Sequence, residues 1–181
     1  MATVRCLRAN VTREEAIARF QGGLAGVLRR AHGSGLRAVA EAYLPFRLYE
    51  LEVVNGAKSQ REWFAIDAVD GSLDLYRFDA PPGGAQTIEI ETRNRPEAGV
   101  EAARSVALLE DKVRRAVFQS GFFRIGNLSL RIEGPPLELS VPYWLGFYGS
   151  GERVRLRVLD AVRRRFEGAK ARALFEAWLA A

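Results

Sequence analysis

Two aspartates stand in matching surroundings at the ends of apolar runs. Asp67 and Asp160 each open an Asp-Ala-Val segment. A carboxyl group among apolar residues has a raised pKa, which suits general acid or base catalysis. An aspartate beside a hairpin also caps the turn through its side-chain oxygens, and no nucleophile motif accompanies either residue. Turn capping is therefore the favoured interpretation, and a hydrolase-like enzyme that uses these carboxylates in a cleft with Tyr43 or Tyr143 remains an alternative.

Aromatic side chains are dense on the long strands that the sequence predicts. Most of them should lie in the core, because aromatic residues bury the largest area per residue. If the sheets curve around a cleft, some would instead line a pocket for a small apolar ligand or a peptide. The candidate ligand-binding residues are Tyr43, Tyr49, Trp63, Tyr143, Trp144 and Tyr148.

Arginine residues gather near the C-terminal end of the chain. The candidate polyanion-binding residues are Arg153, Arg155, Arg157, Arg163, Arg164 and Arg165. The first three alternate with apolar residues, so they project from one face of a strand. Such a ribbon would contact phosphates while nearby aromatic residues stack on bases, which makes polyanion or nucleic-acid binding an alternative function. The solvated side of an ordinary half-exposed strand is the simpler interpretation.

The sequence gives little indication that the chain binds a metal ion or a cofactor. The chain has one cysteine, Cys6, near an N-terminus that we expect to be loose, and one histidine, His32. These two cannot form an internal disulfide or a histidine-based zinc site. The glycines of Gly33-x-Gly35-x-x-Ala38 resemble a dinucleotide-binding fingerprint, but a helix is expected before them where that fingerprint needs a strand. We expect neither a metal nor a cofactor.

Composition places the chain among globular proteins. It has 181 residues, 48% of them hydrophobic, and a net charge of +5. Neither an export signal nor a membrane-spanning run is apparent, so a cytoplasmic protein is expected. A homodimer is a further possibility, because an exposed sheet edge can pair with its counterpart.

The first half of the chain predicts a helix and a meander. Thr12 and Glu15 have the spacing of a capping box, followed by helical periodicity over 12–31. The strands expected next are 36–54, 62–69 and 72–78, joined by turns at Asn55-Gly56 and Asp70-Gly71. Residues 80–85 combine two prolines with two glycines and form the clearest connector.

The second half predicts a similar series of elements. A short strand over 87–91 precedes a helix over 96–119, for which Asn94 and Glu97 offer another capping-box spacing. The remaining elements expected are strands over 122–133, 137–148 and 153–162 and a terminal helix over 168–180.

The two halves can be laid over one another. Leu44-Pro45-Phe46 matches Val141-Pro142-Tyr143, and Asp67-Ala68-Val69 matches Asp160-Ala161-Val162. The sequence therefore predicts an α+β fold made of two repeated helix-plus-antiparallel-meander halves, 1–85 and 86–181, packed as one pseudo-symmetric domain.

The repeated pattern resembles a motif of uncharacterised bacterial and archaeal proteins, including PepSY-like modules. In that motif a Pro-aromatic strand leads through a hairpin to an Asp-Ala-x-x-Gly ending. Gly71 completes the ending in the first copy, whereas Arg164 stands at that place in the second. The resemblance implies a sheet-rich module that binds or regulates. The leading hypothesis is thus a non-enzymatic ligand- or protein-binding module.

Overall fold

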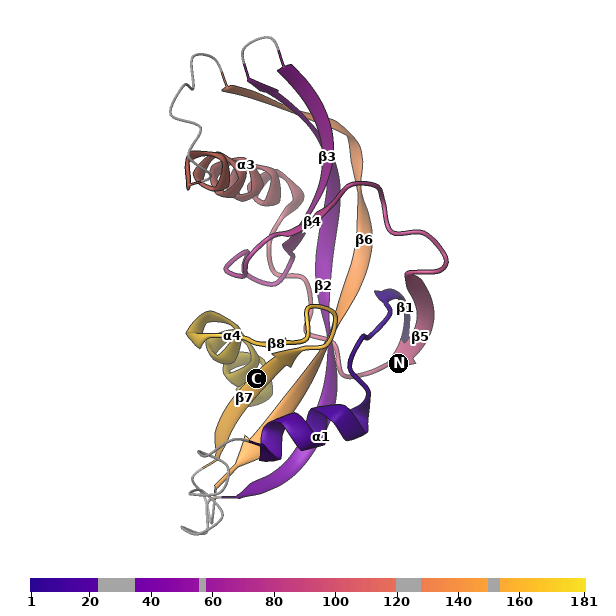
Figure 1. The fold of residues 1–181 in the computed structure, drawn as a ribbon, viewed down its shortest axis with the longest axis vertical. Coiled ribbons are helices and arrows are strands. Elements are labelled where there is room, and N and C mark those ends of the chain that lie inside the picture. The colour runs from indigo at the N-terminus through magenta and orange to yellow at the C-terminus, as the bar shows by residue number, and fades with distance from the viewer. Residues whose placement is uncertain (23–34, 56–57, 120–127, 150–153) are drawn as a thin grey trace. The chain divides into compact units, whose positions relative to one another are not determined.

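A computed structural model describes residues 1–22, 35–55, 58–119, 128–149 and 154–181, with the elements drawn in Figure 1. The helices are α1 (Arg13–Gln21), α3 (Ala102–Gln119) and α4 (Ala169–Ala180). The strands are β1 (Ala2–Leu7), β2 (Leu36–Asn55), β3 (Lys58–Asp67), β4 (Tyr76–Phe78), β5 (Thr87–Thr92), β6 (Leu128–Tyr148), β7 (Arg155–Asp160) and β8 (Arg165–Phe166). The fold is α+β, as the sequence predicts.

The strands of the described residues form one mixed sheet. Its hydrogen-bonded order is β4-β3-β2-β6-β1-β5, and β7 pairs with both β6 and β8. The antiparallel pairs β2–β3 and β3–β4 confirm the expected meander. In contrast, β1 runs parallel to β6, with Cys6 opposite Ser140. The expectation of a wholly antiparallel sheet and a loose N-terminus is wrong, because Val4, Cys6 and Leu7 are buried and hold β1 in the sheet.

Residue contacts divide the chain into two compact units. Unit 1 comprises Met1–Leu44, Ile88–Pro96 and Ser140–Ala181, and unit 2 comprises Pro45–Thr87 and Glu97–Leu139. Both long strands, β2 and β6, contribute residues to each unit. The units therefore alternate along the chain, whereas the repeated halves expected from the sequence share a single boundary after residue 85. The repeat itself stays a prediction.

Unit 2 packs α3 on β2 and β3. Leu109 and Val113 are four residues apart on one face of α3, and both are buried. They join a hydrophobic cluster whose strand residues are Tyr49, Leu51, Phe64 and Ile66. The helix begins at Ala102 rather than at residue 96, so the second capping box is not formed. The N–H groups of Gly99 and Val100 instead donate to the carbonyl oxygen of Ala68 at 2.9 and 3.0 Å.

Unit 1 packs α1 and α4 against its strands. α1 contributes Ala16 and Phe20 to a cluster completed by Val11, Trp144, Tyr148, Leu159 and Ala161. α4 buries Ala171, Leu174 and Phe175, which confirms the expected terminal helix. α1 starts where the capping box predicts and ends at Gln21, earlier than expected. The rest of the predicted first helix, with His32, lies outside the described residues.

Strand β6 is longer than the sequence predicts. A single strand covers Leu128–Tyr148 in place of the two that end and restart near residue 135. Gly134, with a φ of 71°, lies inside it and is followed by two prolines. A glycine in the left-handed region lets a strand bend without ending, which explains why β6 continues through the Gly-Pro-Pro sequence.

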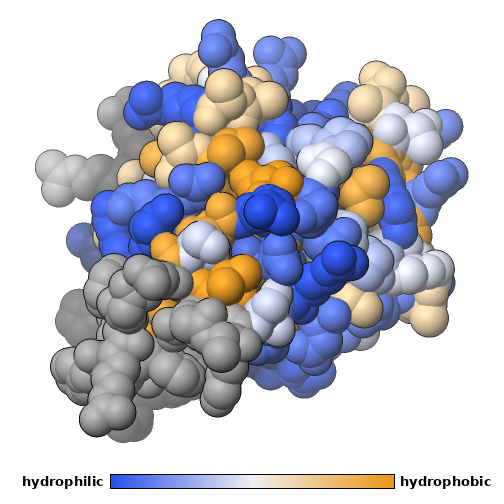
Figure 2. Space-filling model, turned by 90° about the horizontal axis from the view of Figure 1, so that it is seen from above, coloured by the Kyte–Doolittle hydropathy of each residue, from blue (hydrophilic) through white to orange (hydrophobic). Residues whose placement is uncertain are grey.

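The exposed surface is mixed in character. Its large hydrophobic residues, among those described, are Met1, Leu137, Val154, Phe166 and Leu179. Figure 2 shows hydrophobic residues in orange interspersed with hydrophilic ones in blue on one face of the molecule. Scattered apolar residues of this kind are normal on a protein surface and do not define a docking face.

Candidate functional site

The beginning of α1 is fixed by the residues around it. Thr12 is the N-cap, and its Oγ1 accepts a hydrogen bond from the N–H of Glu15 at 3.2 Å. Glu14 accepts hydrogen bonds from its own N–H and from Thr12, which hold its pKa below the ordinary value. The helix therefore presents Arg13, its first residue, at a well-defined place.

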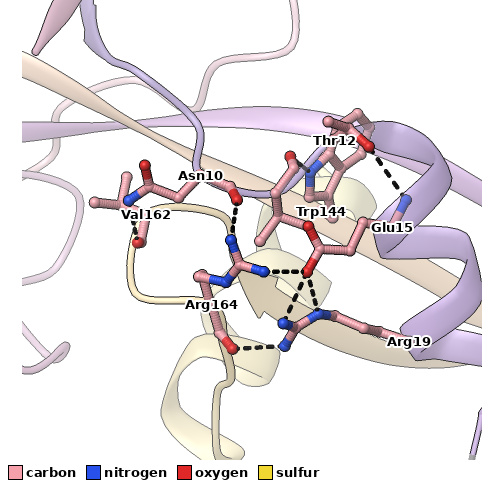
Figure 3. Close-up of polar contacts among 8 residues, drawn as sticks. Asn10, Thr12, Glu15, Arg19, Trp144, Val162 and Arg164 are labelled. Carbon is pink, nitrogen blue, oxygen red and sulfur yellow. Dashed lines mark hydrogen bonds and ion pairs between the residues drawn. The ribbon is translucent and has the colours of Figure 1, made fainter.

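A polar network joins α1 to the turn after β7, as Figure 3 shows. The Glu15 carboxylate pairs with Arg19 at 2.8 Å and with Arg164 at 2.6 Å. Arg164 also donates to the carbonyl oxygen of Asn10, and Arg19 donates to that of Arg164, both at 2.8 Å. The Asn10 side chain donates to the carbonyl oxygen of Val162 at 2.7 Å. This network holds the segment before α1 against the turn.

Trp144 forms the buried base of this region. Its indole Nε1–H donates to the carbonyl oxygen of Val11 at 3.0 Å, and the residue is only 5% exposed. A buried indole needs such a partner, because an unpaired N–H away from water costs free energy. The chain entering α1 is thus tied to β6 as well as to the turn after β7.

A pocket of about 500 Å³ opens beside the start of α1; we call it the Trp144 pocket. The residues that line it are Ala9, Val11, Thr12, Arg13, Val39, Ala40, Glu41, Asn94 and Trp144. All of them belong to unit 1. Small-molecule sites have volumes of roughly 300–1,000 Å³ and combine apolar walls with a few polar groups. The Trp144 pocket meets both descriptions.

The charged groups of the Trp144 pocket have opposite signs. Arg13 and Glu41 are both exposed, and neither forms an ion pair with another of the described residues. Glu41 is hydrogen-bonded to the Tyr43 side chain, and burial together with the charge of Glu41 raises the pKa of Tyr43. Burial, and secondarily Glu41, also raises the pKa of the Cys6 thiol to about 12. Glu41 therefore creates a local negative potential on this side of the pocket.

The six candidate ligand-binding aromatics do not line one cavity. Trp144 lines the Trp144 pocket, and Tyr43 adjoins it through Glu41. Tyr143 packs edge-on against Phe175 at 5.4 Å, and the Tyr148 hydroxyl donates to the carbonyl oxygen of Phe20 at 2.7 Å. These two are core residues of unit 1.

The other two aromatics lie in unit 2. Tyr49 is 2% exposed within the cluster under α3, and its hydroxyl has no hydrogen-bond partner among the described residues. Trp63 is half-buried on β3, opposite Phe78 of β4. Neither is a lining residue of the Trp144 pocket.

Both candidate catalytic aspartates cap turns. Asp67 accepts hydrogen bonds from the N–H groups of Asp70, Gly71 and Leu73 at 2.8 to 3.1 Å, and Asp160 accepts from Val162 and Arg163 at 2.8 Å. Both side chains are fully buried. Burial raises the pKa of Asp67, although the three amide hydrogen bonds oppose the rise. The turn-capping interpretation is confirmed.

The described arginines of the polyanion hypothesis mostly have partners within the chain. Arg157 lies over the ring of Phe166 at 3.8 Å, Arg163 is 4.0 Å from Asp160, and Arg165 pairs with Glu167 at 3.1 Å. Arg164 belongs to the network with Glu15. Arg155 is exposed on β7, and Arg153 lies outside the described residues.

A second pocket, of about 600 Å³, lies in unit 2 at the end of β4. Its lining residues are Arg77, Phe78, Asp79, Ala80 and Gln86. Arg77 is already paired with Glu62 at 2.7 Å, and none of the sequence candidates contributes to the lining. The Trp144 pocket is therefore the stronger candidate.

Sequence reasoning missed three polar residues of the Trp144 pocket: Arg13, Glu41 and Asn94. Arg13 could have been found from the capping box, which places it in the first turn of α1. Glu41 is an isolated carboxylate within a largely apolar strand, a weaker signal. Asn94 was assigned to a helix cap, whereas its carbonyl oxygen accepts a hydrogen bond from the N–H of Tyr43 at 2.9 Å.

Comparison with protein families, with curated proteins and with solved structures finds no match to this chain. The resemblance to PepSY-like modules consequently stays a prediction. In the parts of the chain that the structure describes, no group of three or more His, Cys, Asp or Glu residues could hold a metal ion. Within the same parts, no helix is long and apolar enough to cross a membrane.

Proposed function

We propose that the protein is a non-enzymatic binding module that holds a small ligand in the Trp144 pocket. One observation carries the proposal: Arg13 and Glu41 line the same pocket with opposite charges, and neither forms an ion pair with another described residue. Apolar side chains, among them Val11 and Val39, supply the remaining surface. A concave site with apolar walls and a few polar groups is the usual form of a ligand site.

The two alternative functions have less support. A hydrolase-like enzyme needs a carboxyl group that can reach a substrate, but Asp67 and Asp160 direct their oxygens at backbone amides. A polyanion-binding face needs free guanidinium groups, but Arg163, Arg164 and Arg165 have carboxylate neighbours. The ligand-binding proposal depends on neither set of residues.

A fragment screen by NMR tests the proposal. We expect hits that shift the indole N–H signal of Trp144, and we expect Ala9→Trp, which fills the mouth of the pocket, to weaken them at least tenfold. Ala177→Trp on the exposed side of α4 is the matched control and should leave binding unchanged. If no fragment shifts the Trp144 signal, or if both variants bind equally, the pocket is not a ligand site.

We further propose that the chain consists of two repeated halves. The N–H of Ala68 donates to the carbonyl oxygen of Pro45 at 2.8 Å, and the N–H of Ala161 donates to that of Pro142 at 3.1 Å. In register, Phe46 lies opposite Asp67 just as Tyr143 lies opposite Asp160. Equivalent residues thus make equivalent hydrogen bonds, which supports a duplication.

A further inference from the structure

We infer that the Trp144 pocket selects a small zwitterion, a molecule with an ammonium group, a carboxylate group and a compact apolar body. The inference rests on the proposed function and adds the chemical class of the ligand. It is carried by the arrangement of charge and apolar surface around the pocket.

The two charges come from separate elements on the same pocket. Arg13 belongs to the first turn of α1, and Glu41 belongs to β2. They do not approach within the 4.0 Å of an ion pair, although both line the pocket. A ligand with a single charge would satisfy one of them and leave the other facing a like or neutral group. A zwitterion neutralises both, which is how opposite charges on a site produce specificity.

On the anionic side of the pocket, neighbouring residues hold the Glu41 carboxylate in place. The Tyr43 hydroxyl is hydrogen-bonded to the Glu41 side chain, and burial together with the charge of Glu41 raises the pKa of Tyr43. The N–H of Tyr43 in turn donates to Asn94, another lining residue, at 2.9 Å. Tyr43 is thus a positioning residue that fixes Glu41 and the Asn94 segment together. An ammonium group at Glu41 would form a charge-assisted hydrogen bond.

The cationic side lies at the start of α1. Arg13 follows the N-cap Thr12, where the helix dipole adds partial positive charge. A carboxylate placed there would interact with the guanidinium and with that end of the helix. Val11, Val39 and Trp144 then contact the apolar body that extends from the two charged groups.

Three probes with the same branched apolar chain separate the contributions: leucine, isopentylamine, which lacks the carboxylate of leucine, and 4-methylpentanoate, which lacks its ammonium group. Leucine carries both charges, isopentylamine only the ammonium and 4-methylpentanoate only the carboxylate. Each is titrated into the full chain while the Trp144 indole N–H signal, assigned with Trp144→Phe, is followed by NMR. We expect saturable shifts with leucine and at least tenfold weaker binding of both analogues.

Charge-neutral variants assign each group. Glu41→Gln should reduce leucine affinity about tenfold and leave 4-methylpentanoate unchanged, and Arg13→Gln should reduce it while leaving isopentylamine unchanged. Tyr43→Phe should weaken leucine and isopentylamine but not 4-methylpentanoate, a pattern that general destabilisation would not produce. Glu176→Gln and Arg104→Gln, both exposed and outside the pocket lining, are the matched controls.

The outcomes distinguish this inference from the proposed function. Equal affinities for leucine and either analogue would overturn zwitterion selection while leaving a ligand pocket. Absence of any Trp144 shift with all three probes would also overturn it, and the fragment screen then decides whether the pocket binds other ligands. Weakening by the control variants as large as that by Glu41→Gln would remove the assignment of the charges.

Discussion

Residues of one type take their roles from the groups that surround them. Asp67, Asp160 and Glu41 are all carboxylates, yet the first two are enclosed by backbone amides and the third faces a pocket. The sequence anticipated the turn-capping aspartates because an Asp beside a hairpin is a local pattern. It did not identify Glu41, because the lining of the pocket comes from segments that are far apart in the chain.

The buried thiol of Cys6 yields a pH-dependent prediction. Burial raises its pKa from 9.0 to about 12, and the residue has no exposed surface. The folded protein therefore favours the neutral thiol. This contribution to stability is complete below pH 9 and is lost as the pH rises towards 12, where the unfolded chain is already ionised.

Because the thiolate is the reactive form, we expect Cys6 to resist modification in the folded protein. At pH 8, Ellman's reagent should react with the native chain no faster than the chain unfolds, and at once in denaturing urea. Cys6→Ala supplies the blank. Rapid reaction under native conditions would show that β1 opens readily and that Cys6 is not held as the structure places it.

At the scale of elements, the contact between α1 and β6 depends on a glycine. A Cβ added to Gly146 would lie 2.7 to 2.9 Å from ring atoms of Phe20, closer than side chains tolerate. Gly146→Ala should therefore reduce the free energy of unfolding by about 1–3 kcal/mol, the usual cost of overpacking a core. Urea denaturation measures the change.

Two further variants separate this contact from a general effect of glycine replacement. Gly83 has no atom within 4 Å of an added Cβ, so Gly83→Ala should change stability little. Phe20→Leu removes the ring, and the double variant with Gly146→Ala should lose less than the sum of the single losses. Additive losses would mean that Phe20 does not meet Gly146.

In the turn after β7, a residue other than glycine adopts the left-handed region. Arg164 has a φ of 59°, and Gly71, which like Arg164 comes four residues after the aspartate of an Asp-Ala-Val segment, has a φ of 72°. The left-handed region costs a non-glycine residue about 1–2 kcal/mol. Arg164 offsets this cost through its contacts with Asn10 and Glu15.

At position 164, a glycine variant should therefore be more stable than an alanine variant, the reverse of their usual order of stability. Arg164→Ala loses the contacts and keeps the strained backbone, so we expect a loss of about 1–2 kcal/mol. Arg164→Gly loses the same contacts and removes the strain, so it should be about 1 kcal/mol more stable than Arg164→Ala. In α4, Ala177→Gly should lose about 1 kcal/mol, the ordinary helical order. A less stable glycine variant at 164 would contradict the strain argument.

Local sequence patterns predicted that a helix is present better than they predicted where it begins or which strands pair. The capping box located the start of α1, and the apolar periodicity located α4. The start of α3 was wrong because Gly99 and Val100 donate to a distant carbonyl oxygen, that of Ala68. β1 was missed because its place beside β6 is a pairing between residues far apart in the chain. Interactions of this kind leave no periodic signal in the sequence.

For the whole molecule, the sequence predicted the class of fold but not the division into units. Phe46 lies opposite Asp67 and Tyr143 lies opposite Asp160, so each Pro-aromatic segment pairs with an Asp-Ala-Val segment. The units alternate along the chain because β2 and β6 each contribute residues to both of them. The strand lengths expected from the sequence did not indicate this division. The Trp144 pocket, formed by four separate segments of the chain, follows from that assembly.

The net charge of +5 leads to the last prediction, which concerns binding to polyanions. Arg157, Arg163, Arg164 and Arg165 have partners within the chain, so the excess charge should act as a diffuse field rather than a site. Arg155→Glu on β7 and Arg104→Glu on α3 each lower the net charge by two, from +5 to +3, at exposed positions. On a heparin column, both variants should elute at the same reduced salt concentration, because diffuse attraction depends on total charge. If Arg155→Glu elutes at clearly lower salt than Arg104→Glu, the arginine strand is a specific polyanion site and the alternative function regains support.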